Sequence, residues 1–231
     1  IENKILKKVR IMNRSIAIVT AVVIALGGAW WYWNQSGDSG VSLTAAMAQD
    51  AADIDTSIVQ EMSIGNPDAA VTVIEYASFT CPHCRNFHEN AFGDLKTNYI
   101  DTDKINFIYR EVYFDRFGLW AGMVARCAGS TRYFVITDLL YATQSEWMAG
   151  GDPALIVANL RKLAKTAGMN DEQLDVCLND AEKAQAMVAV FKENATADDV
   201  NATPTFIIDG EKFSNMSYAD FAKILDKKLG E

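Results

Sequence analysis

Residues 71–87 read VTVIEYASFTCPHCRNF, and this stretch decides how the chain folds. Its first part, Val71 to Ala77, is β-branched and almost continuously apolar, which is typical of a strand buried on both faces. Apolar residues then recur at helical spacing, so a helix is expected from about Cys81 to Tyr99. The stretch from Lys104 to Val112 reads as a second strand. These three elements predict a βαβ unit with parallel strands and a right-handed crossover.

The middle of the chain reads as helical. Strand signals disappear between residues 118 and 198, and several helical runs take their place. This pattern predicts an inserted all-helical domain at residues 118–198. We expect its helices at Leu119–Cys127, Tyr133–Thr143, Pro153–Thr166, Asn170–Leu178 and Ala181–Asn194.

The last part of the chain carries the signals of a hairpin and a final helix. Asp209-Gly210 is a two-residue turn between strands expected at Thr205–Ile208 and Glu211–Ser214. Ser217 suits the N-cap of an amphipathic helix from Tyr218 to Leu229. The element order therefore predicts an α/β protein, in which one mixed sheet has helices on both faces and the helical block lies beside it.

The amino-terminal segment carries the signals of export. Residues 1–14 hold five basic residues and one acidic residue, and the uncharged stretch IAIVTAVVIALGGAWWYW follows at residues 16–33. As a helix this stretch reaches about 27 Å, just enough to cross the hydrocarbon core of a membrane. The upstream cations would keep its amino end in the cytoplasm. We predict a basic cytoplasmic segment at residues 1–14 and a signal anchor or signal peptide at residues 15–33. Met12 directly precedes the signal pattern, so translation is a candidate to begin there, with residues 1–11 upstream of the true start.

The apolar segment at 15–33 has two interpretations. A cleaved signal peptide needs small residues soon after the apolar run, and Gly27 and Ala29 supply them. The aromatic residues at 30–33 instead resemble the belt that anchors a helix at a membrane surface, so we favour an uncleaved anchor. Residues 34–60 are then a polar tether, and in both cases the main domain is exported.

The charge of the exported part argues against one class of partner. The whole chain has a formal net charge of −9. Without residues 1–14, 16 basic and 29 acidic residues remain, which gives a net charge of −13. Such a field repels phosphate backbones, so we expect no nucleic-acid binding.

Cys81-Pro82-His83-Cys84 lies where the buried strand gives way to the helix. The amino end of a helix presents free N–H groups and partial positive charge, which stabilise a thiolate at Cys81. Pro82 fits the first turn because its missing N–H has no partner there to lose. His83 can add a donor or a positive charge near the Cys81 sulfur. Cys84 falls on the apolar stripe and suits a shielded resolving thiol, so the motif predicts a redox pair with an oxidising disulfide.

Two other interpretations of these cysteines are weaker. A zinc site needs two further ligands, but the chain has no second Cys-x-x-Cys and only His88 nearby. A structural disulfide across so short a ring would constrain the chain little. We therefore expect no metal and no cofactor beyond the Cys81–Cys84 disulfide itself, and we interpret His88 as a helix-surface or packing residue.

The stretch at 71–87, together with TPTF at residues 203–206, resembles the DsbA-like thiol:disulfide oxidoreductases of the bacterial periplasm, within the thioredoxin superfamily. The resemblance covers about residues 60–230, and Cys-Pro-His-Cys in this setting is highly specific for the DsbA type. It implies a thioredoxin-like domain formed by residues 61–117 and 199–231, with the helical insertion between them. It also implies a periplasmic location, with a tether to the inner membrane if the anchor is retained.

The resemblance assigns roles to single residues as well. It implies that Cys81 is the exposed attacking sulfur and Cys84 its buried partner. Pro204 would be the cis-proline opposite the pair, and Thr203 would contact the sulfurs and the substrate backbone. Glu75, the one charge in its strand, would lie beneath the site and assist proton movement to and from the inner thiol. The alternative for Glu75 is an edge or strand-end acid paired with a lysine.

Cys127 and Cys177 both fall in helical segments of the insertion. In an oxidising compartment we favour a structural disulfide between them, and two buried free thiols are the alternative. The family does not settle the question, because such an extra bridge occurs in some DsbA relatives and not in others.

Together these observations predict an enzyme, an exported dithiol oxidase that works through a mixed disulfide at Cys81. Its partners would be reduced or unfolded exported proteins and a DsbB-like membrane protein that reoxidises it, and we expect a monomer. A disulfide isomerase or reductase with the same centre is the first alternative. It is disfavoured because residues 34–60 look too short for an added dimerisation domain. A peptide-binding chaperone with an incidental disulfide is the alternative from another class.

Overall fold

The computed structural model describes residues 54–231. The predictions for residues 1–14 and 15–33, and for the tether up to residue 53, lie outside the described residues. Within residues 54–231, no helix is long and apolar enough to cross a membrane.

The described chain forms one five-stranded sheet in the order β1-β3-β2-β4-β5. Strands β2 and β3 are parallel, as the βαβ pattern predicts, and every other neighbouring pair is antiparallel. Strand β2 is therefore central, and all its residues are buried except Thr72 and Ile74, which are half-buried. The strands are β1 (Met62–Gly65), β2 (Val71–Ala77), β3 (Ile105–Glu111), β4 (Thr205–Ile208) and β5 (Glu211–Ser214).

Strand β1 is the element of the sheet that the sequence did not predict. It has only four residues, and Gly65 has a positive φ of 94° that a side chain would strain. Its place is fixed by antiparallel pairing with β3, in which Met62 lies opposite Tyr109. Such a short strand is formed by its partner rather than by its own pattern.

The helix that connects β2 to β3 runs from Pro82 to Ile100 and changes its pitch along the way. It contains two π-helical stretches, which the periodicity of the sequence did not predict. The first begins at His88, one turn after Cys84. Its parts are α3 (Pro82–Phe87), η3 (His88–Phe92), α4 (Gly93–Leu95) and η4 (Lys96–Ile100).

The insertion consists of helices, as predicted, with one short helix in addition. Most bounds agree with the sequence patterns, and Pro153 begins its helix after the N-cap Asp152, whose side chain accepts a bond from Leu155 N–H. The added helix, α7, has four residues, which is too short to show a period. The helices are α5 (Arg116–Cys127), α6 (Ser130–Ala142), α7 (Gln144–Trp147), α8 (Pro153–Thr166), α9 (Asp171–Leu178) and α10 (Ala181–Ala197).

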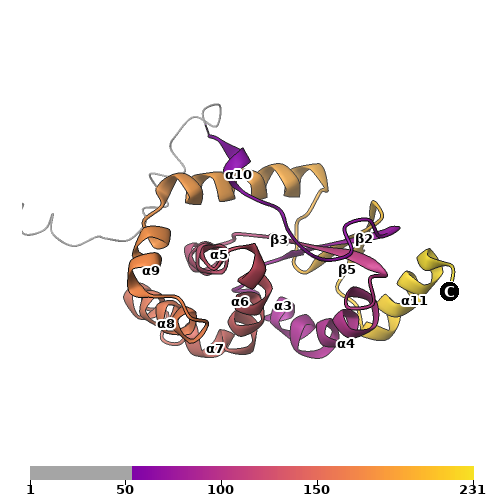
Figure 1. Ribbon diagram of the computed structural model, residues 1–231, viewed down its shortest axis with the longest axis horizontal. Helices are drawn as coiled ribbons and strands as arrows, with labels where there is room; N and C mark the ends of the chain where they lie inside the picture. The colour runs from indigo at the N-terminus through magenta and orange to yellow at the C-terminus, as the bar shows by residue number, and fades with distance from the viewer. Residues whose placement is uncertain (1–53) are drawn as a thin grey trace, which may run out of the picture. The chain divides into compact units, whose positions relative to one another are not determined.

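Helices cover both faces of the sheet (Figure 1). Helix α10 crosses one face, where Phe191 packs on a small cluster that contains Tyr76 and Ile207. The connecting helix and the carboxy-terminal helix α11 (Tyr218–Leu229) cover the other face. On that side the ring of Phe87 meets that of Phe206 at 4.7 Å between centroids. The fold is thus thioredoxin-like, with the helical insertion placed between β3 and β4.

A buried ion pair fixes the insertion to the sheet. Arg126 of α5 donates two hydrogen bonds to the carboxylate of Glu111 at the end of β3, at 2.7 and 2.6 Å. Its third nitrogen donates to the carbonyl oxygen of Gln60 at 2.6 Å. Because both partners are buried and the guanidinium is matched on every side, removing either residue alone would cost about 3–5 kcal/mol.

Cys127 and Cys177 form a disulfide that joins the end of α5 to α9. The two residues are 50 positions apart in the chain. On the chain-entropy argument, a crosslink of that span stabilises the folded state by about 4 kcal/mol. The disulfide therefore joins two helices of the insertion, whereas Cys81 and Cys84 are free thiols in this structure.

Candidate active site

Cys81 lies at the start of α3, where no side chain of the N-cap residue occupies the free N–H groups of the first turn. Cys81 is the N-cap residue, its extended backbone has φ −81° and ψ 120°, and its side chain makes no capping bond. Pro82 occupies the first helical turn, as predicted. The free N–H groups of this turn therefore remain available to the sulfur.

The surroundings of Cys81 favour its thiolate. Its pKa is lowered to about 5, first by a hydrogen bond from the Cys84 thiol and then by the side chain of Thr203. The backbone N–H groups of Cys84 and His83 act in the same direction, and partial burial opposes them. The sulfur also lies 3.5 Å from the carbonyl oxygen of Thr203. Cys81 is thus a thiolate at neutral pH, which is the form that exchanges with disulfides.

Cys84 has the opposite surroundings, although it is only one turn away. It is fully buried, and burial is the main reason that its pKa is raised well above the ordinary range. The hydrogen bond to Cys81 and the charge of Glu75 raise it further. The pair therefore holds one reactive anion and one protected thiol, as a nucleophile and its resolving partner require.

Thr203 and Pro204 lie next to this pair, at the start of β4. The peptide bond between them is cis. A cavity of about 360 Å³ opens beside them and is lined also by His83 and Phe213. The side chain of His83 is exposed at this cavity, and the contribution to the Cys81 pKa noted above comes from its backbone N–H. The motif and the residues expected to bind substrate are therefore adjacent in space.

Glu75 is completely buried on the central strand. Its carboxylate oxygens lie 3.0 and 3.2 Å from Nε2 of His88. The alternative of an edge acid paired with lysine is therefore wrong, since the strand is central and the partner is a histidine. Of the two interpretations of His88, the surface residue is wrong and the packing residue is confirmed, because its side chain is only 3% exposed and its ring stacks on Tyr141. His88 follows Cys84 by four residues, and this spacing could have indicated that it shares the buried face.

The insertion holds the turn that carries Cys81. Gln144 of α7 is buried and donates its amide to the carbonyl oxygens of Phe79 and Cys81, at 2.8 and 3.1 Å. The Tyr141 hydroxyl donates to the Ser78 carbonyl at 3.2 Å. These bonds add side-chain donors to carbonyl groups at the turn, of which those of Ser78 and Cys81 also accept backbone N–H bonds. No local pattern in the sequence indicates Gln144, because more than sixty residues separate it from the turn.

Thr80, the residue before Cys81, is hydrogen-bonded to the start of the insertion. Its hydroxyl donates to the carboxylate of Asp115 at 2.6 Å. Asp115 is also the N-cap of α5 and accepts bonds from the N–H groups of Phe117 and Gly118. The motif is therefore held by both ends of the α5–α7 segment.

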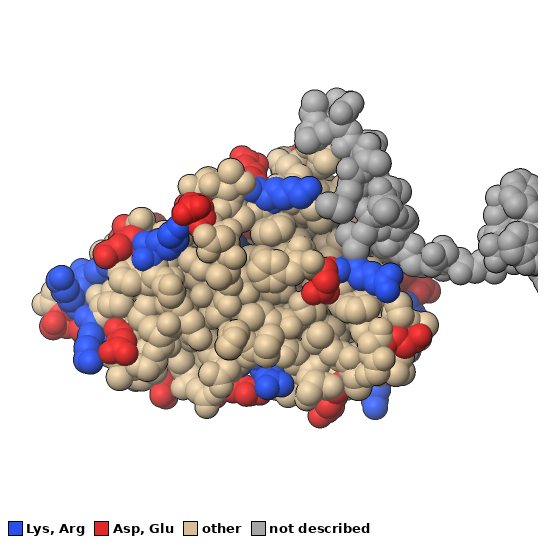
Figure 2. Space-filling view, turned by 180° about the vertical axis from the view of Figure 1, so that it is seen from behind, with Lys and Arg blue, Asp and Glu red and all other residues tan. Residues whose placement is uncertain are grey.

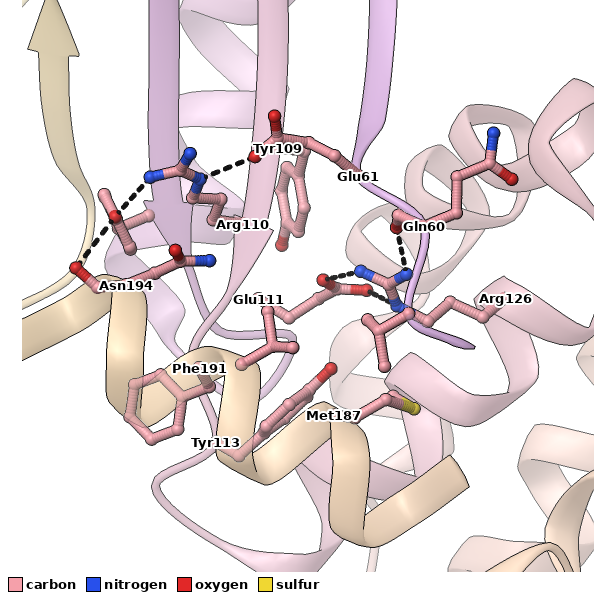
Figure 3. Close-up of a pocket in the computed structure, with 13 residues that line it drawn as sticks. Gln60, Glu61, Tyr109, Arg110, Glu111, Tyr113, Arg126, Met187, Phe191 and Asn194 are labelled. Carbon is pink, nitrogen blue, oxygen red and sulfur yellow. Dashed lines mark hydrogen bonds and ion pairs between the residues drawn. The ribbon is translucent and has the colours of Figure 1, made fainter. Parts of the chain in front are cut away.

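A second cavity, of about 240 Å³, lies at the carboxyl end of β3 and is lined also by residues of α10 (Figure 3). Its charged groups are already paired: Arg126 with Glu111 as above, and Arg110 with Glu61 at 2.8 Å. None of its lining residues belongs to the cysteine motif. No group of three or more His, Cys, Asp or Glu residues within residues 54–231 is placed to hold a metal ion.

Figure 2 shows the charged side chains on one face of the molecule. Basic and acidic side chains alternate around a broad uncharged area on that face. Many surface charges pair locally, for example Lys212 with Asp199 at 2.7 Å and Arg161 with Asp171 at 2.8 Å. Such exposed pairs contribute little to stability, so the fold depends on its core and on the buried contacts above.

The fold and the motif define a thioredoxin-type protein with a Cys-x-x-Cys site at the start of a helix. A family model described as thioredoxin matches residues 57–227. The crystal structure of Wolbachia pipientis alpha-DsbA1 is similar with a TM-score of 0.68 and 25% identity, covering 76% of this chain and 96% of that one. This chain belongs to the thioredoxin family, and its structure is similar to that of a DsbA protein.

Curated relatives agree with this assignment. A Rickettsia bellii protein named "Putative protein-disulfide oxidoreductase" is 30% identical over 172 residues, which cover 74% of this chain and 65% of that protein. The chain thus spans less than two thirds of the length of this relative. The Bacillus subtilis "Disulfide bond formation protein D" is 24% identical over 189 residues, covering 78% of this chain and 82% of its own length.

The reactivity of Cys81 tests the electrostatics of the site. In the reduced protein, we expect its alkylation rate by iodoacetamide to rise with pH around a midpoint near 5. A free cysteine has its midpoint at about 8.5. Cys84 should stay unmodified until the protein is unfolded, as mass spectrometry of the alkylated peptides would show.

Two substitutions at the neighbouring cysteine make this test specific. Cys84→Ala removes the hydrogen bond that lowers the Cys81 pKa most, so the midpoint should rise. Cys84→Ser keeps a donor and should hold the midpoint low. A wild-type midpoint close to that of a free cysteine would show that the helix start does not stabilise the thiolate.

Proposed function

We propose that the protein is an exported dithiol oxidase, which introduces disulfides into other proteins through Cys81 and Cys84. The observation that carries the proposal is the opposite protonation preference of these two neighbouring sulfurs. A thiolate stabilised in the reduced protein favours the reduced pair, so the disulfide form becomes a strong oxidant. The names of the relatives, a putative protein-disulfide oxidoreductase and a disulfide bond formation protein, support the proposal.

The reaction begins with the Cys81–Cys84 disulfide. A substrate thiolate attacks the Cys81 sulfur, the sulfur–sulfur bond breaks, and its electron pair leaves on Cys84, which then takes up a proton. Cys81 is the accessible sulfur of the two, whereas Cys84 is fully buried, so attack at Cys81 is favoured.

A second substrate thiolate then attacks the substrate sulfur of this mixed disulfide. Cys81 leaves as a thiolate, which its lowered pKa makes a good leaving group. The substrate has lost two electrons and gained a disulfide, and the enzyme holds the dithiol. We propose that a DsbB-like membrane protein accepts these two electrons and restores the Cys81–Cys84 disulfide.

Substrate would bind beside the cis peptide bond. Thr203 and Pro204 line the 360 Å³ cavity next to Cys81, and Phe213 gives it an apolar wall. An extended segment of a reduced protein could lie along this cavity and present its cysteine to the accessible sulfur of Cys81. This arrangement suits a broad range of substrates, because backbone contacts do not select for sequence.

Oxidase activity is tested with a reduced, unfolded protein that has two cysteines. We expect catalytic loss of its thiols with wild-type protein and none with Cys81→Ser, since Cys81 is the attacked sulfur. The variant with both Cys127→Ala and Cys177→Ala is the matched control, because it removes two cysteines outside the site and should retain activity. The reduction potential of the wild-type pair should be more oxidising than about −200 mV.

Three results would argue for another function. A potential near about −270 mV would indicate a reductase of the thioredoxin kind. Rearrangement of wrongly paired disulfides without net oxidation would indicate an isomerase. Retained activity of Cys81→Ser in preventing aggregation, with no thiol oxidation by either form, would indicate a chaperone.

The proposed location rests on the sequence alone. We propose that the apolar segment at 15–33 carries the domain into the periplasm and stays as an anchor in the inner membrane. Alkaline phosphatase fused after residue 60 should be active in bacterial cells and should sediment with the membranes. An inactive reporter would contradict export, whereas an active reporter that is released in soluble form would show cleavage of the segment.

A further inference from the structure

Glu75 and His88 form a buried pair on the inner side of the cysteine motif. Nε2 of His88 lies 3.0 and 3.2 Å from the two carboxylate oxygens. The side chains are 0% and 3% exposed. His88 follows Cys84 by one helical turn, and the charge of Glu75 acts on the Cys84 sulfur. The pair is therefore part of the environment of the resolving thiol.

The hydrogen bonds define which ring nitrogen of His88 carries the proton. Nδ1 of His88 is buried and has no partner among residues 54–231. A proton on Nδ1 would be a buried donor without an acceptor, which is more costly than a bare acceptor. The favoured form is therefore a neutral imidazole whose Nε2–H donates to both oxygens of an ionised Glu75.

The groups packed around the pair give Glu75 no other donor within the described residues. Tyr109 lies opposite Glu75 on β3, but its hydroxyl bonds to that of Tyr141 at 2.5 Å. The ring of Tyr141 stacks on His88 at 4.2 Å between centroids. Cys84 lies one helical turn before His88. Asp138 of α6 is also near, and its carboxyl interacts with the charges of His88 and of Lys96 in η4. The whole stabilisation of the carboxylate therefore depends on His88.

We propose that His88 is a positioning residue for thiol exchange, which keeps the buried Glu75 ionised so that Glu75 can take the proton of Cys84. The proposal rests on the proposed function. Cys84 needs such a base, because burial holds it in the thiol form that cannot attack a disulfide. Without the imidazole N–H, an ionised carboxylate in this site would have no compensating bond and would take up a proton instead.

The step concerned is the closing of the Cys81–Cys84 disulfide. Cys81 is then joined to a partner sulfur in a mixed disulfide, and the Cys84 thiol gives its proton to the carboxylate of Glu75. The Cys84 thiolate forms a new bond to the Cys81 sulfur. The old bond breaks, and the partner sulfur leaves with its electron pair as a thiolate. The dithiol is oxidised by two electrons, which the partner receives.

Glutathione disulfide is a probe that separates this step from the one before it. Mixing it with reduced protein first gives a Cys81–glutathione mixed disulfide, and Cys84 then resolves it. Acid quenching followed by intact-mass spectrometry gives the rate of each step. His88→Phe retains the ring that stacks on Tyr141 but removes the N–H. We expect resolution at pH 7 to slow by about tenfold to a hundredfold, the value of a hydrogen bond to a charged group.

Attack by Cys81 should be unchanged in His88→Phe, and this serves as the internal test of folding. His88→Gln carries an amide donor of similar reach and should restore most of the rate. In a Glu75→Gln background, His88→Phe should have no further effect, because the residue acts through Glu75.

The outcomes separate this inference from the proposed function. Equal resolution rates in wild type and His88→Phe would overturn it, as would an equal slowing by His88→Phe in the Glu75→Gln background. His88→Gln as slow as His88→Phe would overturn it too. If wild-type protein forms no mixed disulfide with glutathione, the proposed function itself fails, and that result is visible before any variant is compared.

Discussion

The sulfur atoms of Cys81 and Cys84 lie one helical turn apart, yet their surroundings favour opposite protonation states. The start of α3 supplies N–H groups and the Cys84 thiol to Cys81, whereas burial and the Glu75 charge act against an anion at Cys84. This difference is what makes the pair chemically directional: one sulfur is attacked and leaves easily, and the other closes the disulfide from inside. Most of the features around the motif serve to maintain it.

The helical insertion does more than cover one end of the sheet. Gln144 and Tyr141 bind carbonyl oxygens of the turn before α3, and Asp115 holds Thr80. The insertion is itself fixed, through the bidentate pair of Arg126 with Glu111. The turn is thereby joined to the core on both sides, so that Cys81 can be partly exposed while its backbone stays fixed. A site that needs a precise helix start gains from such support.

The sequence predicted those elements whose signals are local. The buried β2 pattern, the hairpin turn at Asp209-Gly210 and the start of α8 at Pro153 all appear at the expected residues. Elements that depend on partners could not be predicted from the sequence. Strand β1 forms through its pairing with β3, and α7 is too short to show a helical period. The same holds within the site. The motif and the resemblance predict Cys81, Cys84 and Glu75 as site residues, whereas Gln144 and the partnership of His88 with Glu75 require contacts that only the fold brings together.

The most direct test of the central claim compares the stability of the two redox states. It uses protein with Cys127→Ala and Cys177→Ala, so that reductant changes only the Cys81–Cys84 pair. The short ring of this disulfide restrains the unfolded chain by only about 2 kcal/mol. The lowered Cys81 pKa stabilises the reduced folded state. This stabilisation is complete at pH values above the pKa of the thiol in the unfolded chain, decreases as the pH falls below that value, and is lost at about pH 5. Urea unfolding at pH 7 should therefore show a larger free energy of unfolding for the reduced form, with the advantage shrinking toward pH 5. A more stable oxidised form at pH 7 would contradict the account.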